Sequence, residues 1–257
     1  MIKKHIITCT VIIALLAMAK VFAYNMTRAT EKLSKTNYTT VEPTTLKTEK
    51  IAEPLSLMAQ LSFAEESLPL GDSRVERKMK KVLAAHSYKH LQTNSLHRKA
   101  QEWFPIIEPI LAKYGIPDDF KYVPLVEYGL KGGVSPKGAA GFWQFMPGTA
   151  RMYGLKINSR VDERKNLKKS TIAAAKYIKE LYGIFGSWTL AAAAYNVGDI
   201  HMKKQIHRQN QDNYFKMRLN RETGAYVYKL ISMKEIMEDP VNHGYVNRKP
   251  LLAYNPD

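Results

Sequence analysis

The chain has 257 residues, 45% of them apolar, and a net charge of +16 at pH 7. This length can hold one large domain or a domain with tails, and the apolar content suffices for a packed core, which excludes a chain that is disordered throughout. The basic excess favours anionic partners, such as the polymers of a cell envelope, or nucleic acid. Its lysines and arginines are scattered and form no nucleic-acid-binding motif, so we expect no nucleic-acid partner.

The amino end predicts an export signal over residues 1–23. Two lysines precede an apolar run from Ile6 to Ala19, and the smaller residues Val21 and Ala23 suit cleavage by signal peptidase. The run is shorter than the roughly 20 residues needed to span a bilayer. We therefore expect export to the periplasm or cell envelope, with no integral membrane span after cleavage. An uncleaved signal would instead tether the protein to the membrane.

The sequence gives little support for metal or cofactor chemistry. Its single cysteine, Cys9, lies inside the signal segment, so cleavage leaves no disulfide and no thiolate ligand. His86 and His90 are four residues apart on a predicted helix, but the acid and the third ligand of a zinc motif are missing. We expect two solvent-facing histidines, no metal and no cofactor.

A flexible linker is predicted over residues 24–62, where Thr, Lys, Glu and Pro are frequent and apolar residues follow no period. The composition changes at about Phe63. We expect one folded domain over 63–240 and a C-terminal tail over 241–257. No alternating pattern is long enough to make a sheet, so the fold class is predicted to be all-α.

Helical spacing of apolar residues dominates this domain. Helices are expected, in chain order, over 77–91, 96–114, 117–128, 147–153, 171–181, 188–196 and 222–237. Ser95 and Ser170 are expected to cap two of them, and Pro105 and Pro109 to disturb the second. Gly129 ends the third helix. The expected product is a compact helical domain with an irregular loop after that helix.

Polar residues that suit sugar cleavage lie around this loop. Glu127 precedes it, the glycine-rich string 138–150 contributes Gln144, and Tyr195-Asn196 follows about fifty residues later. Many glycosidases use a second carboxylate. The candidates for a second acid are Asp162, Glu163, Asp199 and Glu222, none of which belongs to the glycine loop. Asp162, Glu163 and Arg164 are expected to form a loop salt bridge or cap instead.

Several short segments carry a family resemblance when they are taken in order. They are Tyr122-Val-Pro-Leu-Val-Glu127, then 135–151, then Val161-Asp-Glu-Arg164, then 188–198, then Arg221-Glu-Thr223 and Tyr226-Val227. This ordered set resembles the lytic transglycosylases of the goose-type-lysozyme-like superfamily, most closely the D-type membrane-bound members. The resemblance covers roughly 76–238. It implies a lysozyme-like domain that cleaves the β-1,4 bond between N-acetylmuramic acid and N-acetylglucosamine in peptidoglycan and forms a 1,6-anhydromuramic end.

The resemblance also implies roles for single residues. Glu127 would be the only acid/base. Gln144 would contact the sugar or hold its acetamido group, and Tyr195 and Asn196 would orient the acid and the substrate. Tyr226 would help to fix the carboxyl group. For both tyrosines, ordinary core packing with a satisfied hydroxyl is the alternative. The implied partners are peptidoglycan glycan strands.

The neighbours of the acid are expected to shape the site. Tyr128, Phe142 and Trp143 could supply an apolar setting that raises the pKa of the acid. Gly138 and Gly141 would allow a tight turn that lets sugar approach, or would serve the turn alone.

Two features depart from the family pattern. Tyr128 stands where a serine usually follows the catalytic Glu, which could change how glycan sits or slow turnover. D-type members commonly carry LysM modules after the catalytic domain, and only about twenty residues follow Met237 here. Wall targeting is then expected to depend on the basic surface or on a partner protein. A muramidase that uses water, or a peptidoglycan-binding scaffold with weak turnover, are the alternative functions.

Overall fold

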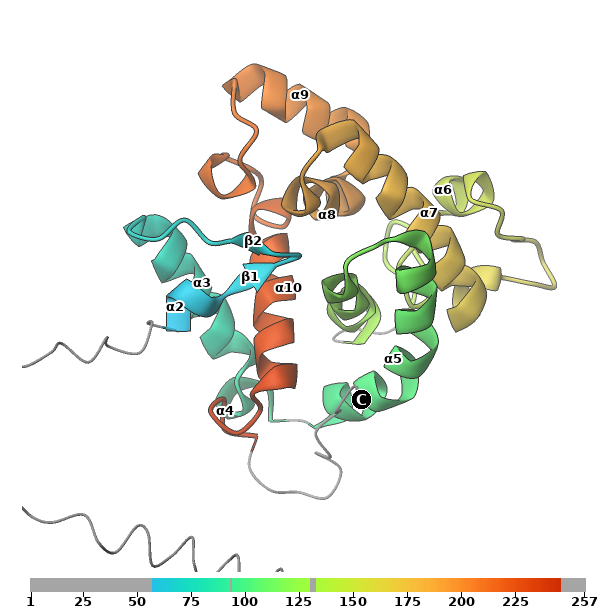
Figure 1. Ribbon diagram of the computed structural model, residues 1–257. Helices are drawn as coiled ribbons and strands as arrows, with labels where there is room; N and C mark the ends of the chain where they lie inside the picture. Colours follow the sequence, from blue (N-terminus) through green and yellow to red (C-terminus); the bar gives the residue numbers. More distant parts are fainter. Residues whose placement is uncertain (1–56, 93, 130–132, 246–257) are drawn as a thin grey trace, which may run out of the picture. The chain divides into compact units, whose positions relative to one another are not determined.

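A computed structural model describes residues 57–92, 94–129 and 133–245, which belong to one compact unit (Figure 1). The expected signal peptide, most of the expected linker and most of the expected tail lie outside the described residues. The all-α fold class is confirmed. Across the described part of the chain, no helix is both long and apolar enough to cross a membrane.

The elements follow one another in an almost wholly helical order. They are α2 (Leu57–Gln60), β1 (Ser62–Phe63), β2 (Glu66–Ser67), α3 (Ser73–His86), α4 (Tyr88–Leu91), α5 (Ser95–Tyr114), the 3-10 helix η1 (Asp118–Tyr122), the π-helix η2 (Leu125–Gly129), α6 (Pro147–Met152), the 3-10 helix η3 (Glu163–Lys165), α7 (Leu167–Phe185), α8 (Trp188–Val197), α9 (Asp199–Gln209), the 3-10 helix η4 (Tyr214–Lys216) and α10 (Thr223–Glu238). The two short strands form an antiparallel hairpin.

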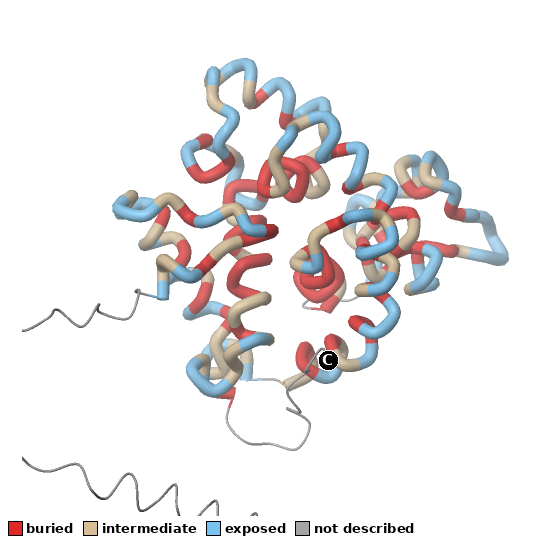
Figure 2. Tube along the Cα trace, in the orientation of Figure 1, coloured by how far each residue is buried: buried red, intermediate tan, exposed pale blue. Residues whose placement is uncertain are grey.

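The core forms where α8 meets α7 and α10, while α5 packs on α7 and α3 packs on α10 (Figure 1). The four alanines Ala191 to Ala194 of α8 are fully buried. Small side chains at a helix contact let the axes approach closely. Helix α10 is buried along most of its length (Figure 2). The polar ends of α8 and α10 are thereby held beside one another.

The hairpin places the carboxylate of Glu66 at the N-terminus of α8. Four donors reach the carboxylate of Glu66: Ser187 Oγ at 2.8 Å, Thr189 N at 3.1 Å, Thr189 Oγ1 at 2.6 Å and Trp188 N. A negative charge stabilises a helix N-terminus because the unpaired N–H groups and the helix dipole favour anions. Glu66 therefore anchors the helix whose last turn carries Tyr195 and Asn196. The sequence pattern did not predict this contact.

The largest difference from expectation lies between Pro117 and Gly129. The sequence predicts one helix there, and the structure has η1 followed by η2. Pro124 lies between them and has no N–H, so it cannot make the α-helical hydrogen bond to the fourth residue before it. Single π-helical turns are rare and often mark functional sites. This turn carries Glu127.

Other differences concern helix ends. Ser170 does not cap α7: the helix begins earlier, Asn166 accepts from Lys169 N, and Ser170 Oγ donates to Asn166 O inside the first turns. Helix α5 continues through both Pro105 and Pro109, whose rings are exposed while its opposite face is buried. Helix α9 had no sequence counterpart among the expected elements.

Candidate active site

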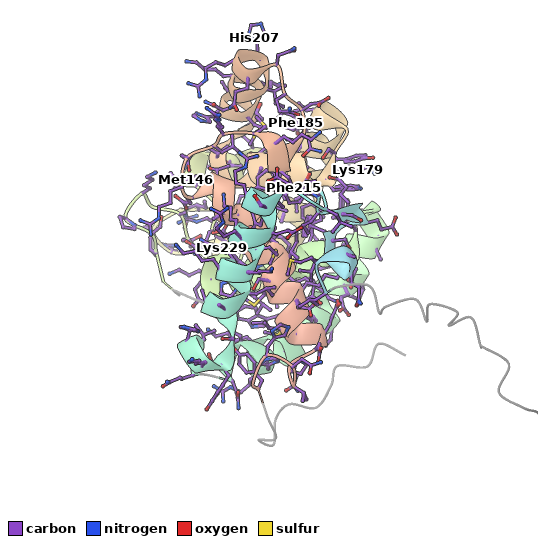
Figure 3. All side chains as sticks on the ribbon, turned by 90° about the vertical axis from the view of Figure 1, so that its left-hand side faces the viewer. Met146, Lys179, Phe185, His207, Phe215 and Lys229 are labelled. Carbon is purple, nitrogen blue, oxygen red and sulfur yellow. The ribbon has the colours of Figure 1, made fainter. Side chains whose placement is uncertain are left out.

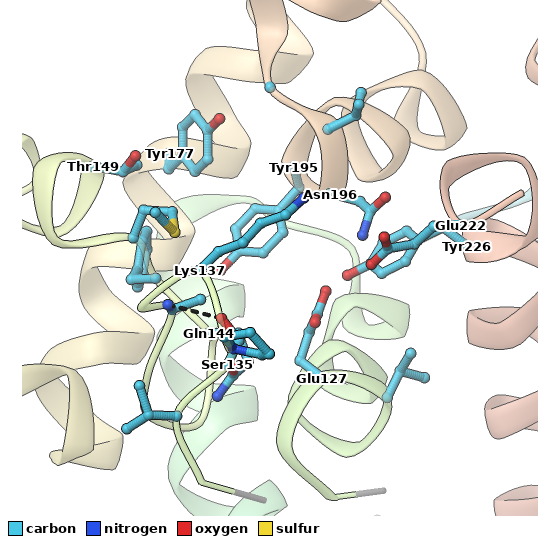
Figure 4. Close-up of a pocket in the computed structure, with 18 of the residues that line it drawn as sticks. Glu127, Ser135, Lys137, Gln144, Thr149, Tyr177, Tyr195, Asn196, Glu222 and Tyr226 are labelled. Carbon is cyan, nitrogen blue, oxygen red and sulfur yellow. Dashed lines mark hydrogen bonds between the residues drawn. The ribbon is translucent and has the colours of Figure 1, made fainter. Parts of the chain in front are cut away.

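A pocket of about 660 Å³ opens beside η2 (Figure 4). Its polar lining comes from η2, from the loop after it, and from α6, α7, α8 and α10. The polar side chains of the lining are Glu127, Ser135, Lys137, Gln144, Thr149, Tyr177, Tyr195, Asn196, Glu222, Tyr226 and Lys229. Five predicted site residues, Glu127, Gln144, Tyr195, Asn196 and Tyr226, are thus brought together from segments up to a hundred residues apart.

Tyr195 ties α8 to the glycine-rich loop. Its hydroxyl donates to Trp143 O at 2.7 Å, and the indole of the fully buried Trp143 donates to Thr171 Oγ1 at 2.9 Å. Burial, followed by the nearby charge of Glu127, holds the pKa of Tyr195 well above its usual value. Tyr195 is therefore a neutral donor that fixes the loop and borders the pocket.

Gln144 is held inside the loop by its own amide. The residue has a positive φ of 47°, and its Nε2 donates to Gly141 O at 2.9 Å and to Gly133 O at 3.2 Å. Because the amide nitrogen is occupied by loop carbonyls, the amide oxygen is the atom left to accept a hydrogen bond from a ligand.

A chain of hydrogen bonds fixes the amide of Asn196. Asn220 Nδ2 donates to Thr223 Oγ1 at 3.0 Å, and Thr223 Oγ1 donates to Asn196 Oδ1 at 3.0 Å. The oxygen of the Asn196 amide therefore accepts a hydrogen bond from the first residue of α10. Its NH₂ group is the end presented to the pocket, on the side of Glu127 (Figure 4).

Tyr226 faces Glu127 across the pocket (Figure 4). Its ring is 2% exposed, and no hydrogen bond of standard geometry reaches its hydroxyl within the described chain. Burial first, then the negative charge of Glu127 and the hydrogen bond that its carboxylate can accept from this hydroxyl, hold the pKa of Tyr226 well above its usual value. Tyr226 therefore presents a neutral hydroxyl to the carboxyl group.

Three other predicted site residues lie outside the pocket lining. Tyr128 and Phe142 pack on Trp103, with ring centroids 6.1 Å and 5.0 Å from it and 5.5 Å from each other. Gly141 has a φ of 79°, and a Cβ there would lie 1.9 Å from Arg164 O. This close approach and the positive φ explain why glycine occupies position 141. Substrate contacts by these three residues stay a prediction.

Arg164 holds the loop in shape. Its buried guanidinium donates to Gly138 O at 2.8 Å and to Phe145 O at 2.9 Å, and it pairs with Asp162 at 2.7 Å. Hydrogen bonds from Arg164 hold the pKa of Asp162 below its usual value. Glu163 pairs with Lys169. The expected loop salt bridges are confirmed.

Of the four candidates for a second carboxylate, Glu222 lines the pocket. Asp162 and Glu163 belong to the Arg164 loop, and Asp199 lies 3.7 Å from Lys203 on α9. Glu222 precedes α10 and lies close to Tyr226 (Figure 4). It is the one carboxylate of this set that could share a substrate with Glu127.

The histidine pair differs from expectation. His86 is buried rather than solvent-facing, because α10 covers it and its Nδ1 lies 3.0 Å from Ser232 Oγ. His90 is exposed and lies 3.3 Å from Ser87 Oγ. Within the described ranges, no group of three or more potential ligands is placed to hold a metal ion.

Known proteins resemble this chain over the same region. Residues 107–218 match the Transglycosylase SLT domain. Two proteins from strains of Escherichia coli, each named membrane-bound lytic murein transglycosylase D, are 30% identical over 192 residues, which is 71% of this chain and 42% of theirs. A putative tributyltin chloride resistance protein from an Alteromonas species is 27% identical over 149 residues, which is 56% of this chain and 72% of that protein.

A solved structure is also similar. It is the X-ray structure of an inactive mutant of the lytic transglycosylase Slt from Pseudomonas aeruginosa, at 19% identity and a TM-score of 0.41, over 72% of this chain and 32% of that one. A similarity this low adds nothing to the assignment of the site. The chain spans less than half the length of its Escherichia coli relatives. The matched segment contains Glu127, the glycine-rich loop and Tyr195-Asn196, and over this segment the chain is similar to lytic transglycosylases.

Proposed function

We propose that this protein is a peptidoglycan lytic transglycosylase that cleaves the β-1,4 bond between N-acetylmuramic acid and N-acetylglucosamine, with Glu127 as its single acid/base. The observation that carries the proposal is the pocket in which Glu127 faces Tyr226 and Asn196 (Figure 4). The SLT domain contains two of these three residues. The names of the Escherichia coli relatives support the same activity and a place in the cell envelope.

The proposed reaction passes one proton through Glu127. The protonated carboxyl group gives its proton to the glycosidic oxygen as the bond to the anomeric carbon breaks. The carboxylate then takes a proton from the 6-hydroxyl of the same muramic residue, whose oxygen bonds to the anomeric carbon. The product is a 1,6-anhydro ring, Glu127 regains its proton, and no water is consumed.

The neighbouring groups suit the two stages of this cycle. The Asn196 NH₂ group and the Tyr226 hydroxyl are donors, so both stabilise the carboxylate form of Glu127 between the two proton transfers. The oxygen of Gln144 is available to accept from the N–H of an acetamido group. Rigid supports, Trp143 O for Tyr195 and Thr223 for Asn196, hold these groups in place.

One observation favours a second candidate, a muramidase that hydrolyses the same bond. Glu222 lines the same pocket as Glu127 and could activate water or serve as a nucleophile across the sugar. Under the proposed single-acid mechanism, Glu222→Gln retains most of the turnover. Under the hydrolytic mechanism, it abolishes turnover.

Mass spectrometry of purified peptidoglycan after digestion tests the proposal. The wild-type protein should release muropeptides with 1,6-anhydro ends. Reducing ends would establish the muramidase, and the absence of products with retained binding would establish a scaffold. The Glu127→Gln protein is the matched control, because any products that it releases do not come from this site.

We extend the proposal to the rest of the chain. The signal peptide would cover 1–23, the linker 24–62, the catalytic domain 63–240 and the tail 241–257. The protein would be exported to the periplasm or cell envelope, where its basic surface would meet anionic polymers. Fractionation of cells that express the full chain, followed by amino-terminal sequencing, tests both the location and the cleavage after Ala23.

A further inference from the structure

One face of α10, together with the residue directly before the helix, contributes a row of side chains to the pocket. Glu222, Tyr226 and Lys229 follow at spacings of four and three residues, which places them on the same side of a helix. At 1.5 Å of rise per residue, Lys229 lies about 4.5 Å beyond Tyr226 along the helix axis. The cation therefore lies to one side of the position where Tyr226 faces Glu127.

A second cation lines the pocket from the other wall. Lys137 belongs to the loop that precedes the glycine-rich string, and Lys229 belongs to α10. Met146, which also lines the pocket from the loop side, lies toward the same side of the domain as Lys229 (Figure 3). A ligand in this pocket would therefore meet positive charges contributed by two different segments.

Four lysines of the described chain have a carboxylate partner: Lys121, Lys169, Lys203 and Lys234. Other lysines, such as Lys204, form no ion pair with a described carboxylate, and Lys229 and Lys137 differ from these because they line the pocket. Lys229 is half-buried and Lys137 is exposed, and neither forms an ion pair with a described carboxylate. The charge of Lys229 also adds to burial in lowering the pKa of His86 to about 4. A partly buried cation without a counter-ion favours an anionic ligand, because pairing offsets its desolvation.

We propose that Lys229, together with Lys137 across the pocket, binds carboxylates of the peptide attached to muramic acid. The enzyme then prefers strands that carry peptides. The inference rests on the proposed function, since it assumes a peptidoglycan strand in the pocket. The sugar rings are neutral, so charge recognition must come from the substituent of muramic acid. That substituent offers two sources of carboxylate: the attached peptide, or the lactyl group itself once the peptide is removed.

Binding by the Glu127→Gln protein separates these sources without turnover. Three probes are compared: a glycan fragment that carries peptides, the same fragment stripped of peptides, and a neutral oligomer of N-acetylglucosamine. In this background, Lys229→Gln should lower the affinity for the peptide-bearing fragment about tenfold relative to the neutral oligomer, the usual size of a lost charge-assisted hydrogen bond. Lys229→Arg should retain most of the preference.

Lys204→Gln is the matched control. Lys204 is exposed on α9 and does not line the pocket. Its substitution by Gln changes the net charge of the protein by the same amount as Lys229→Gln. Lys137→Gln, on an exposed loop residue, serves as the second variant if Lys229→Gln fails to fold, and it should weaken the same preference. Raised ionic strength should shrink the difference between the peptide-bearing and neutral probes.

Three outcomes overturn the inference. Equal affinities before and after substitution would remove both lysines from recognition. An equal loss with Lys204→Gln would make the effect one of net charge. An equal loss on peptide-bearing and stripped fragments would assign the cations to the lactyl carboxylate. The binding comparison uses the Glu127→Gln protein and does not depend on turnover. If the wild-type protein formed no anhydro ends, the proposed function would be contradicted, and the binding comparison would still test the role of the two lysines.

Discussion

Glu127 and Tyr128 are neighbours in η2, but their side chains belong to two different regions of the protein. Glu127 faces a polar pocket, where Tyr226 and Asn196 lie on other helices (Figure 4). Tyr128 packs with Trp103 and Phe142 in an aromatic cluster outside the pocket lining. The pocket is held by hydrogen bonds to fixed backbone and side-chain groups, and the cluster is held by ring contacts. We therefore expect substitutions on the pocket side to change chemistry and those on the cluster side to change stability.

The largest effect should come from the pocket side. Glu127→Gln keeps the shape of the side chain and removes its proton chemistry. We expect turnover on peptidoglycan to fall by at least about 10² to 10⁴-fold, with the melting temperature preserved. Product release measured by mass spectrometry, beside a melting curve, checks both parts. Wild-type rates in a folded Glu127→Gln protein would remove Glu127 from the acid/base role.

The loop between the two regions should be sensitive to a single methyl group. Gly141→Ala combines a left-handed backbone with a Cβ placed 1.9 Å from Arg164 O. We expect a loss of roughly 3 kcal/mol or more in the free energy of unfolding. Gly138 has a similar φ of 86° with nothing within 4 Å, so Gly138→Ala should lose only about 1–2 kcal/mol. Equal losses in urea melts would show that backbone strain alone matters.

Part of the pH dependence of stability should come from outside both regions, from the buried histidines His86 on α3 and His97 on α5. Burial lowers the pKa of His97 to about 4, and burial with the charge of Lys229 does the same for His86. Both pKa values lie below the usual 6.5, so the unfolded chain takes up protons first as pH falls. The free energy of unfolding should therefore be unaffected by these two histidines above about pH 6.5. Between pH 6.5 and pH 4 it should fall by roughly 3 kcal/mol for each of them.

His97→Phe isolates one of these groups. The ring lies against Tyr245, with centroids 4.7 Å apart, and its Nε2 is buried without a partner in the described structure. The variant should match the wild type closely near pH 8 and lose less stability towards pH 4. Urea melts at both pH values give the comparison, and an unchanged difference between them would contradict the assignment.

Substitutions in the aromatic cluster should lower the stability of the protein. Tyr128→Ser removes a half-buried ring from Trp103 and Phe142, and we expect about 2 kcal/mol of lost unfolding free energy. Tyr128→Phe keeps the ring and should stay near the wild type. In both variants the pH profile of turnover should keep its shape. A shifted upper limb in Tyr128→Ser would instead place this side chain beside the acid.

The smallest predicted effect concerns the orientation of Asn196. Thr223→Val keeps the size of the side chain but removes the hydroxyl that fixes the amide. We expect kcat to fall about tenfold with KM little changed, and Thr223→Ser to restore most of it. The effect should vanish in an Asn196→Ala background, since the two residues act as a unit. An undiminished loss there would give Thr223 a separate role.

Local patterns determined much of what the sequence revealed. Helical periodicity predicted the all-α class and the long helices, because an amphipathic or alanine-rich segment carries its own signal. The ordered motifs also selected Glu127, Gln144, Tyr195, Asn196 and Tyr226, and the structure gathers all five at one pocket.

Tertiary structure decided what depends on distant neighbours. The carboxylate of Glu66 caps a helix more than a hundred residues away, and Arg164 O fills the space that Gly141 leaves open. Neither partner can be recognised from its own surroundings in the chain. The direction of Tyr128 was equally hidden, because it depends on the π-helical turn after Pro124 and on the rings of Trp103 and Phe142. Sequence spacing specifies which residues share an element, whereas the packing of elements decides which groups face one another.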